Sequence, residues 1–152
     1  MINLQRRLVA EWLGTALLLA TVVGSGIMAE RLASGNVGLA LLANSIATGG
    51  ALIALILTFG SVSGAHFNPA VSLAAALRGE LGKGETLYYI GAQIFGAFAG
   101  VAAAHMMFGE PLFFASQHVR SGPAQWWSEF VASFGLLAVI LGCSRHRAES
   151  VP

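Results

Sequence analysis

The 152-residue sequence has few charged residues, one cysteine and no aspartate. Charged residues make up 10% of the chain, against about 25% in soluble domains. Because 56% of the residues are hydrophobic, this composition excludes an ordinary soluble domain and indicates an integral membrane protein. The lone Cys143 excludes an internal disulfide, and we expect it to be a buried, unreactive thiol.

Arrangements typical of catalysis, metal binding and nucleic-acid binding are also missing. The four histidines, His66, His105, His118 and His146, are scattered without metal-ligand spacing. No nucleophile–base arrangement or phosphate-binding loop is present. A net charge of +1 gives no case for nucleic-acid binding. We therefore expect no enzyme, no metal, no cofactor and no nucleic-acid partner.

Long apolar segments dominate what remains. Residues 32–77 contain no Asp, Glu, Lys or Arg, roughly twice the about 20 residues that one membrane crossing needs. The sequence predicts four crossings, near 8–28, 37–59, 86–107 and 125–143, and a half-length helix over 68–77. We expect the long run to break at Gly60, Ser61, Ser63 and Gly64. Glu11 interrupts the first segment, which favours an uncleaved membrane helix over a signal peptide.

The basic residues predict how the chain is oriented. With a cytoplasmic N-terminus, six basic residues fall inside (Arg6, Arg7, Arg78, Lys83, Arg145 and Arg147), and two fall outside (Arg31 and Arg120). The second crossing then ends inside, so the segment through His66 must re-enter the membrane from the cytoplasmic side. Small residues spaced by four, at Ala92, Gly96, Gly100 and Ala104, predict close helix packing and nothing about chemistry.

An internal repeat is visible at an offset of 118 residues. Residues 10–19 align with residues 128–137, and each copy has a glutamate early in an apolar helix, Glu11 and Glu129. The two copies enter from opposite sides, which is typical of inverted repeats in transport proteins. Adding this offset to Asn68 predicts a second re-entrant asparagine near position 186. We therefore expect 1–120 to form a first repeat and 121–152 to open a second.

The segment Asn68-Pro69 starts a helix where lipid could not satisfy its free backbone N–H groups. Pro69 suits the first helical position, which makes Asn68 the N-cap or its neighbour. An N-cap is a frequent role for asparagine. Such a start at bilayer depth is tolerated where it lines a polar pathway, so we favour a functional role.

Residues 63–71, Ser-Gly-Ala-His-Phe-Asn-Pro-Ala-Val, resemble the first Asn-Pro-Ala box of the aquaporin (major intrinsic protein) family. The helix starts at Glu11 and Glu129 and the Ala92-Gln93 pair are similar to the same family. The resemblance implies an all-α membrane protein, a right-handed aquaporin-like bundle truncated to four transmembrane helices and one re-entrant half-helix. It implies a homotetramer in the intact relative.

The same resemblance implies roles for individual residues. Asn68, Pro69 and Ala70 would form the central pore box, and His66 would line the cytoplasmic vestibule. Glu11, Glu129 and Gln93 would support the re-entrant loops, although a glutamate near the interface could instead reach water.

By the same resemblance, Thr48, 20 residues before Asn68, would lie at the outer constriction, where relatives carry a bulky aromatic residue. This small residue implies a wider opening that suits glycerol, urea or an uncharged metalloid acid. The equal alternative is that the Thr48 hydroxyl only bonds a carbonyl within its own helix.

The sequence thus predicts a passive channel of the bacterial inner membrane for water or small neutral solutes. Because the second box is absent, we expect that the isolated chain does not conduct as a monomer. The alternative is a non-conducting partner that associates with full-length channels. Co-purification with a full-length relative, together with flux measured for the chain alone, separates these two hypotheses.

Overall fold

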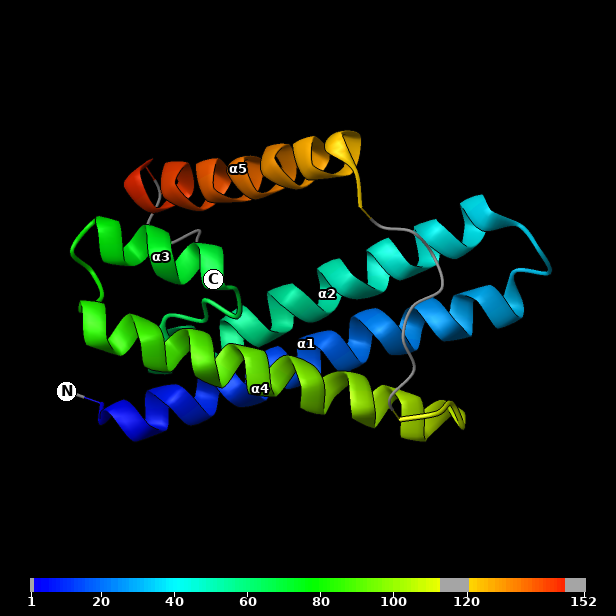
Figure 1. Ribbon diagram of the computed structural model, residues 1–152, viewed down its shortest axis with the longest axis horizontal. Helices are drawn as coiled ribbons and strands as arrows, with labels where there is room; N and C mark the ends of the chain where they lie inside the picture. The colour runs from blue at the N-terminus through cyan, green and yellow to red at the C-terminus, as the bar shows by residue number, and fades with distance from the viewer. Residues whose placement is uncertain (1, 113–120, 147–152) are drawn as a thin grey trace. The chain divides into compact units, whose positions relative to one another are not determined.

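A computed structural model describes residues 2–112 and 121–146 as a set of five α-helices. They are α1 (Leu4–Leu32), α2 (Val37–Ser63), α3 (Pro69–Leu77), α4 (Lys83–Phe108) and α5 (Pro123–His146) (Figure 1). Four of them, α1, α2, α4 and α5, are long and apolar enough to cross a membrane. This arrangement confirms the predicted all-α class with four long helices and one short one.

Helix α1 begins before its apolar segment because a polar residue caps its N-terminus. Asn3 Oδ1 accepts a hydrogen bond from Gln5 N at 2.7 Å, so α1 begins at Leu4. Of the residues predicted to break the run, Gly60, Ser61 and Ser63 lie within α2, and the break falls at Gly64. Intrahelical hydrogen bonds hold this stretch, and the helix ends only where Gly64 adopts a left-handed conformation with φ of 88°.

The chain forms two compact units, residues 1–113 and 114–152. In the first unit α1 contacts both α2 and α4, and α3 packs against α4 (Figure 1). The contact between α1 and α4 depends on glycine: a Cβ at Gly96 or Gly100 would overlap the carbonyl of Trp12 or Ala16. The predicted small-residue stripe therefore lies at a helix–helix contact.

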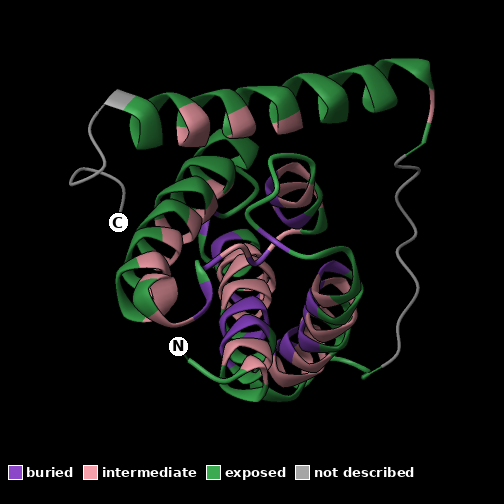
Figure 2. Cartoon of the chain, turned by 90° about the vertical axis from the view of Figure 1, so that its left-hand side faces the viewer, coloured by how far each residue is buried: buried purple, intermediate pink, exposed green. Residues whose placement is uncertain are grey.

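The largest fully buried side chains of this unit, those of Tyr89, Gln93, Glu11 and Ser72, all carry polar groups. Glu11 and Ser72 are 0% exposed and Gln93 is 1% exposed, while Ser63 is the single buried residue of α2. Figure 2 colours the chain by the burial of its residues. The outer faces of the helices carry exposed Leu, Ile, Val and Phe side chains. This inversion of the soluble pattern suits a protein whose surroundings are lipid.

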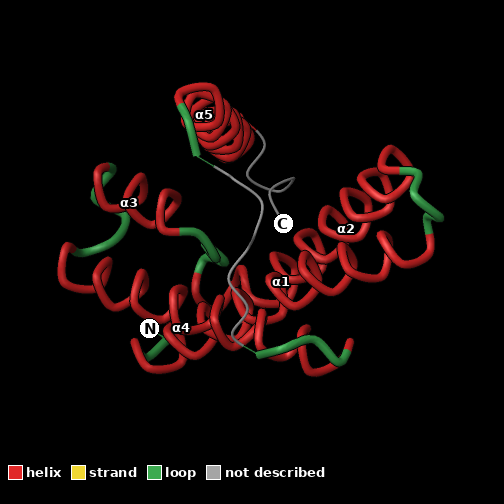
Figure 3. The backbone as a smooth tube through the Cα atoms, turned by 45° about the vertical axis from the view of Figure 1, so that its right-hand side comes forward, coloured by secondary structure: helices red, strands yellow, loops and turns green. Residues whose placement is uncertain are grey.

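The half-length helix α3 follows a short loop that turns back from the end of α2 (Figure 3). With 9 residues, α3 is about 14 Å long, half of the hydrocarbon thickness. The second unit contains α5, whose surface is largely exposed. Cys143, expected to be buried, is exposed there, so that expectation is wrong: α5 buries no residue of its apolar window.

Candidate functional site

The start of α3 has the geometry of an asparagine N-cap. Asn68 has extended backbone angles, and its Oδ1 accepts a hydrogen bond from Ala70 N at 2.8 Å. Pro69 occupies the first helical position, where a missing N–H costs nothing. The Nδ2 amide of Asn68 makes no hydrogen bond to the described part of the chain, and the residue is half-buried. This amide is therefore a donor that an oxygen atom outside the protein can use.

The loop that precedes α3 has an unusual backbone. Three of its residues have positive φ, with Gly64 at 88°, Ala65 at 48° and Phe67 at 49°. A residue with a Cβ pays about 1–2 kcal/mol for this left-handed conformation. Other interactions must therefore hold the loop in place.

Glu11 provides the main interactions that hold this loop. Its Oε1 accepts hydrogen bonds from Ser63 Oγ at 2.6 Å and from His66 N at 3.0 Å. Its Oε2 accepts from Phe67 N and from Gln93 Nε2, each at 2.8 Å. The carboxylate thus joins α1, α2, the loop and α4 from one buried point.

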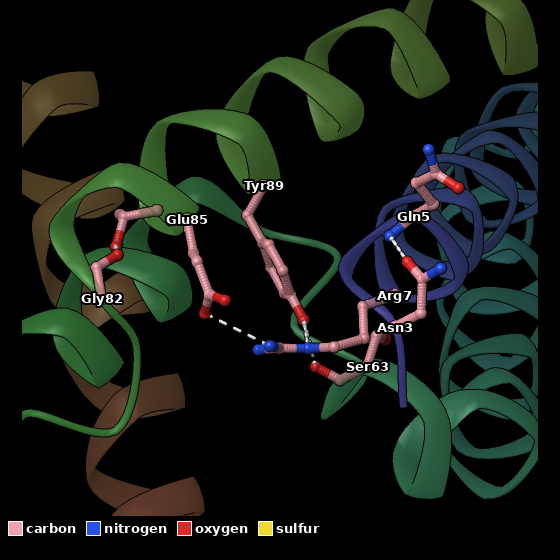
Figure 4. Close-up of polar contacts among 8 residues, drawn as sticks. Asn3, Gln5, Arg7, Ser63, Gly82, Glu85 and Tyr89 are labelled. Atoms are coloured by element: carbon pink, nitrogen blue, oxygen red, sulfur yellow. Dashed lines mark hydrogen bonds and ion pairs between the residues drawn. The ribbon is translucent and has the colours of Figure 1, made fainter. Parts of the chain in front are cut away.

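A second set of contacts anchors the end of α2. The hydroxyl of Tyr89, which is 0% exposed, donates to Ser63 O at 2.9 Å and accepts from Arg7 Nε at 2.8 Å (Figure 4). The same guanidinium pairs with Glu85 at 3.2 Å. Arg7 and Glu85 are partly exposed, so this chain of contacts leads from the surface to the loop.

His66 faces the first turn of α3. Its Nδ1 lies 3.0 Å from Ser72 Oγ, and that oxygen accepts a hydrogen bond from Gln93 Nε2 at 2.9 Å. The imidazole ring lies 5.4 Å from the ring of Tyr89. Two buried polar atoms, Thr15 Oγ1 and Gln93 Oε1, have no hydrogen-bond partner in the described residues.

Phe67 fills the space between the loop and α1. Its ring packs edge-on against Phe59 with centroids 6.1 Å apart. A Cβ at Gly14 would overlap this ring, so the close approach requires glycine at that position. Phe67 is 4% exposed, and its burial helps to offset the backbone strain.

Thr48 lies on α2 and takes part in other contacts. Its hydroxyl donates to Asn44 Oδ1 at 3.1 Å, one turn earlier, and Asn44 Nδ2 donates to Val22 O of α1 at 3.2 Å. The hydroxyl is thus held by a side chain of its own helix rather than by a backbone carbonyl. Thr48 as a whole is half-buried.

The structure therefore brings together Glu11, His66, Asn68 and Gln93 around the loop, while Glu129 lies exposed on α5 in the other unit. The sequence reasoning missed several members of the cluster: Ser63, Ser72, Tyr89 and Gly14. Tyr89 could have been found because it precedes Gln93 by one helical turn and so shares its face.

Comparison with known proteins gives a consistent result. Residues 1–151 match the family described as major intrinsic protein. The chain is 55% identical over 150 residues to the aquaglyceroporin AqpS of Rhizobium meliloti (strain 1021), covering 99% of this chain and 64% of that protein.

Two further relatives match shorter stretches. Aquaporin-9 of Homo sapiens is 37% identical over 101 residues, covering 66% of this chain and 33% of that protein. The propanediol uptake facilitator PduF of Citrobacter freundii is 36% identical over 107 residues, covering 70% of this chain and 39% of that protein. The chain thus spans between 33% and 64% of the length of these three relatives. On the match over residues 1–151, the chain belongs to the major intrinsic protein family.

Proposed function

We propose that this chain provides the first half of a passive transmembrane channel for water or small neutral solutes. The observation that carries this proposal is the start of α3. There the buried Glu11 carboxylate holds a strained loop. This loop places the free amide of Asn68 at the N-terminus of α3. In lipid such a helix start is tolerated only beside a polar cavity.

The electrostatics of this site favour neutral solutes. The N-terminus of a helix carries roughly half a positive charge, which repels cations. Glu11 is fully buried and already accepts four hydrogen bonds, so its oxygens are not available to an ion. The proposed transport therefore involves no ion coupling and no covalent chemistry.

Thr48 and the named relatives support a class of solute for this channel. A threonine at an outer constriction leaves more room than an aromatic side chain would, and pore diameter with lining donors sets selectivity. One relative is an aquaglyceroporin and another is a propanediol uptake facilitator. These features support glycerol, urea or an uncharged metalloid acid beside water as the solute of this chain.

For the domain organisation we propose a first repeat over 1–120 and the opening helix of a second repeat over 121–152. The division of the chain after Phe113 supports this boundary. We also propose a cytoplasmic N-terminus, a location in the bacterial inner membrane and assembly as a homotetramer. The distribution of arginine and lysine supports the orientation.

The proposal is tested with a chimera in which this chain replaces the matched stretch of the R. meliloti aquaglyceroporin. Proteoliposomes containing the chimera should swell faster than empty vesicles in stopped-flow measurements with glycerol or urea. The 152-residue chain alone should give no flux as a monomer. A chimera that reaches the membrane folded, yet passes neither water nor any of these solutes, would contradict the proposal.

A non-conducting partner of full-length channels is the second candidate. It is favoured by α2, which buries one residue and leaves a long apolar face uncovered in the described unit. Co-purification of the chain with the full-length aquaglyceroporin, combined with no flux from the chimera, would support this candidate instead.

A further inference from the structure

The hydrogen bonds around Glu11 determine which way the Gln93 amide points. Every contact of the Glu11 carboxylate in the described residues comes from a donor, and one donor is Gln93 Nε2 at 2.8 Å. If the amide were flipped, its oxygen would face a carboxylate oxygen at this distance, and neither could donate. Gln93 therefore directs its two N–H groups toward Glu11 and Ser72.

The Gln93 amide in turn determines what Ser72 does. Ser72 Oγ accepts the second N–H of Gln93 at 2.9 Å. Its one hydroxyl hydrogen then has a single acceptor within reach in the described chain, which is His66 Nδ1 at 3.0 Å. A neutral imidazole that accepts at Nδ1 carries its hydrogen on Nε2.

We propose that Gln93 and Ser72 are positioning residues that fix His66 as its Nε2–H tautomer, so that the loop offers a hydrogen-bond donor to the solute. The Nε2 atom makes no hydrogen bond to the described residues and is not sealed from solvent. Asn68 Nδ2 is a second unused donor two residues further along. Two donors in succession suit a solute with oxygen acceptors.

The statement that this donor meets a solute rests on the proposed channel function, whereas the tautomer itself does not. The tautomer is an equilibrium property of the folded chain, and it can be measured without any flux. One net hydrogen bond is worth about 1 kcal/mol, which biases the tautomer ratio by about fivefold.

The test is long-range ¹H–¹⁵N correlation NMR of the 152-residue chain with ¹⁵N-labelled histidine, in phosphatidylcholine nanodiscs at alkaline pH, where the imidazole is neutral. The His66→Asn spectrum identifies the His66 signals by their loss. We expect the Nε2–H pattern in the unsubstituted chain. Ser72→Ala removes the donor to His66 Nδ1. Gln93→Met removes the N–H that Ser72 Oγ accepts, so that Ser72 can accept a hydrogen bond from Nδ1–H instead of donating to Nδ1. Both substitutions should therefore shift the ratio of the two tautomers toward Nδ1–H by about fivefold.

Ser45→Ala is the matched control, because the Ser45 hydroxyl donates to Leu41 O of its own helix and should leave His66 unchanged. A predominant Nδ1–H tautomer in the unsubstituted chain overturns the assignment. An unchanged ratio in both Ser72→Ala and Gln93→Met also overturns it. A conducting chimera with the Nδ1–H form would refute this inference alone, whereas the Nε2–H form in a chimera without flux would refute the proposed function alone.

Discussion

Glu11→Gln is the substitution that tests the architecture of the loop most severely, because it changes no shape and removes one acceptor. In the native unit the two carboxylate oxygens serve two donor pairs. Oε1 accepts from Ser63 and His66, and Oε2 accepts from Phe67 and Gln93. A glutamine can offer an oxygen to only one pair, and its NH₂ group must face the other.

The cheaper orientation turns the NH₂ group toward Ser63. That hydroxyl already accepts from Ala65 N at 3.1 Å and can accept a second hydrogen bond. The N–H of His66 then loses its partner, at a cost of about 1–3 kcal/mol. The two bonds to the remaining oxygen lose their charge assistance, at roughly 1 kcal/mol each. Glu11→Gln should therefore lower the free energy of unfolding by about 3–5 kcal/mol, against total stabilities of about 5–15 kcal/mol.

The assay is reversible unfolding of the purified chain by SDS in mixed micelles, with hydrogen exchange of the His66 amide as the local probe. Glu30→Gln is the matched control: it makes the same chemical change on the same helix, at an exposed position without an ion pair in the described residues. The control should stay within about 0.5 kcal/mol of the unsubstituted chain. If Glu11→Gln matched the control in both stability and exchange, the carboxylate would not hold the loop.

Three further substitutions follow from the packing and from the proposed constriction. Gly100→Ala places a Cβ against an α1 carbonyl and should lower the free energy of unfolding by about 1–3 kcal/mol. The control Gly91→Ala adds its Cβ in open space and should be neutral or stabilising by up to about 1 kcal/mol. Equal effects of the two substitutions in SDS unfolding would contradict the close α1–α4 contact. Tyr89→Phe removes a buried hydroxyl with two partners and should cost about 1–3 kcal/mol, while Tyr88→Phe, 61% exposed, should change unfolding by less than about 0.5 kcal/mol. Thr48→Phe in the chimera should reduce glycerol flux at least about tenfold while sparing water, as expected for a narrowed pore; unchanged glycerol swelling would place Thr48 away from the constriction.

Much of the fold could be predicted from the sequence because lipid leaves few options. Apolar length alone located four crossings, and Asn68-Pro69 located the start of α3. The helix bounds were less predictable, since caps such as Asn3 extend helices beyond the apolar residues. Gly60 was misjudged because a glycine inside a helix looks no different in sequence from the left-handed Gly64 that ends it.

The candidate site was predicted by residue type more than by contact. The resemblance to the family implied that Glu11 supports a loop, but neither the four donors around it nor the Ser72–His66 bond follows from any local pattern. These contacts join residues as far apart as 11 and 93, and only packing of α1 on α4 brings them together. The face of Tyr89 was predictable from its spacing to Gln93, but its hydrogen bonds to Arg7 and Ser63 were not.

The central claim is that the start of α3 lines the solute pathway. Asn68→Asp in the chimera tests it most directly, because aspartate keeps the N-cap acceptor while it removes the free amide donor and adds a negative charge. Asn36→Asp makes the same change at the N-cap of α2, where the side chain accepts from Leu39 N. With folding equal in both variants, glycerol permeability should fall at least about tenfold for Asn68→Asp and stay unchanged for Asn36→Asp. Equal permeability in the two variants would contradict the claim.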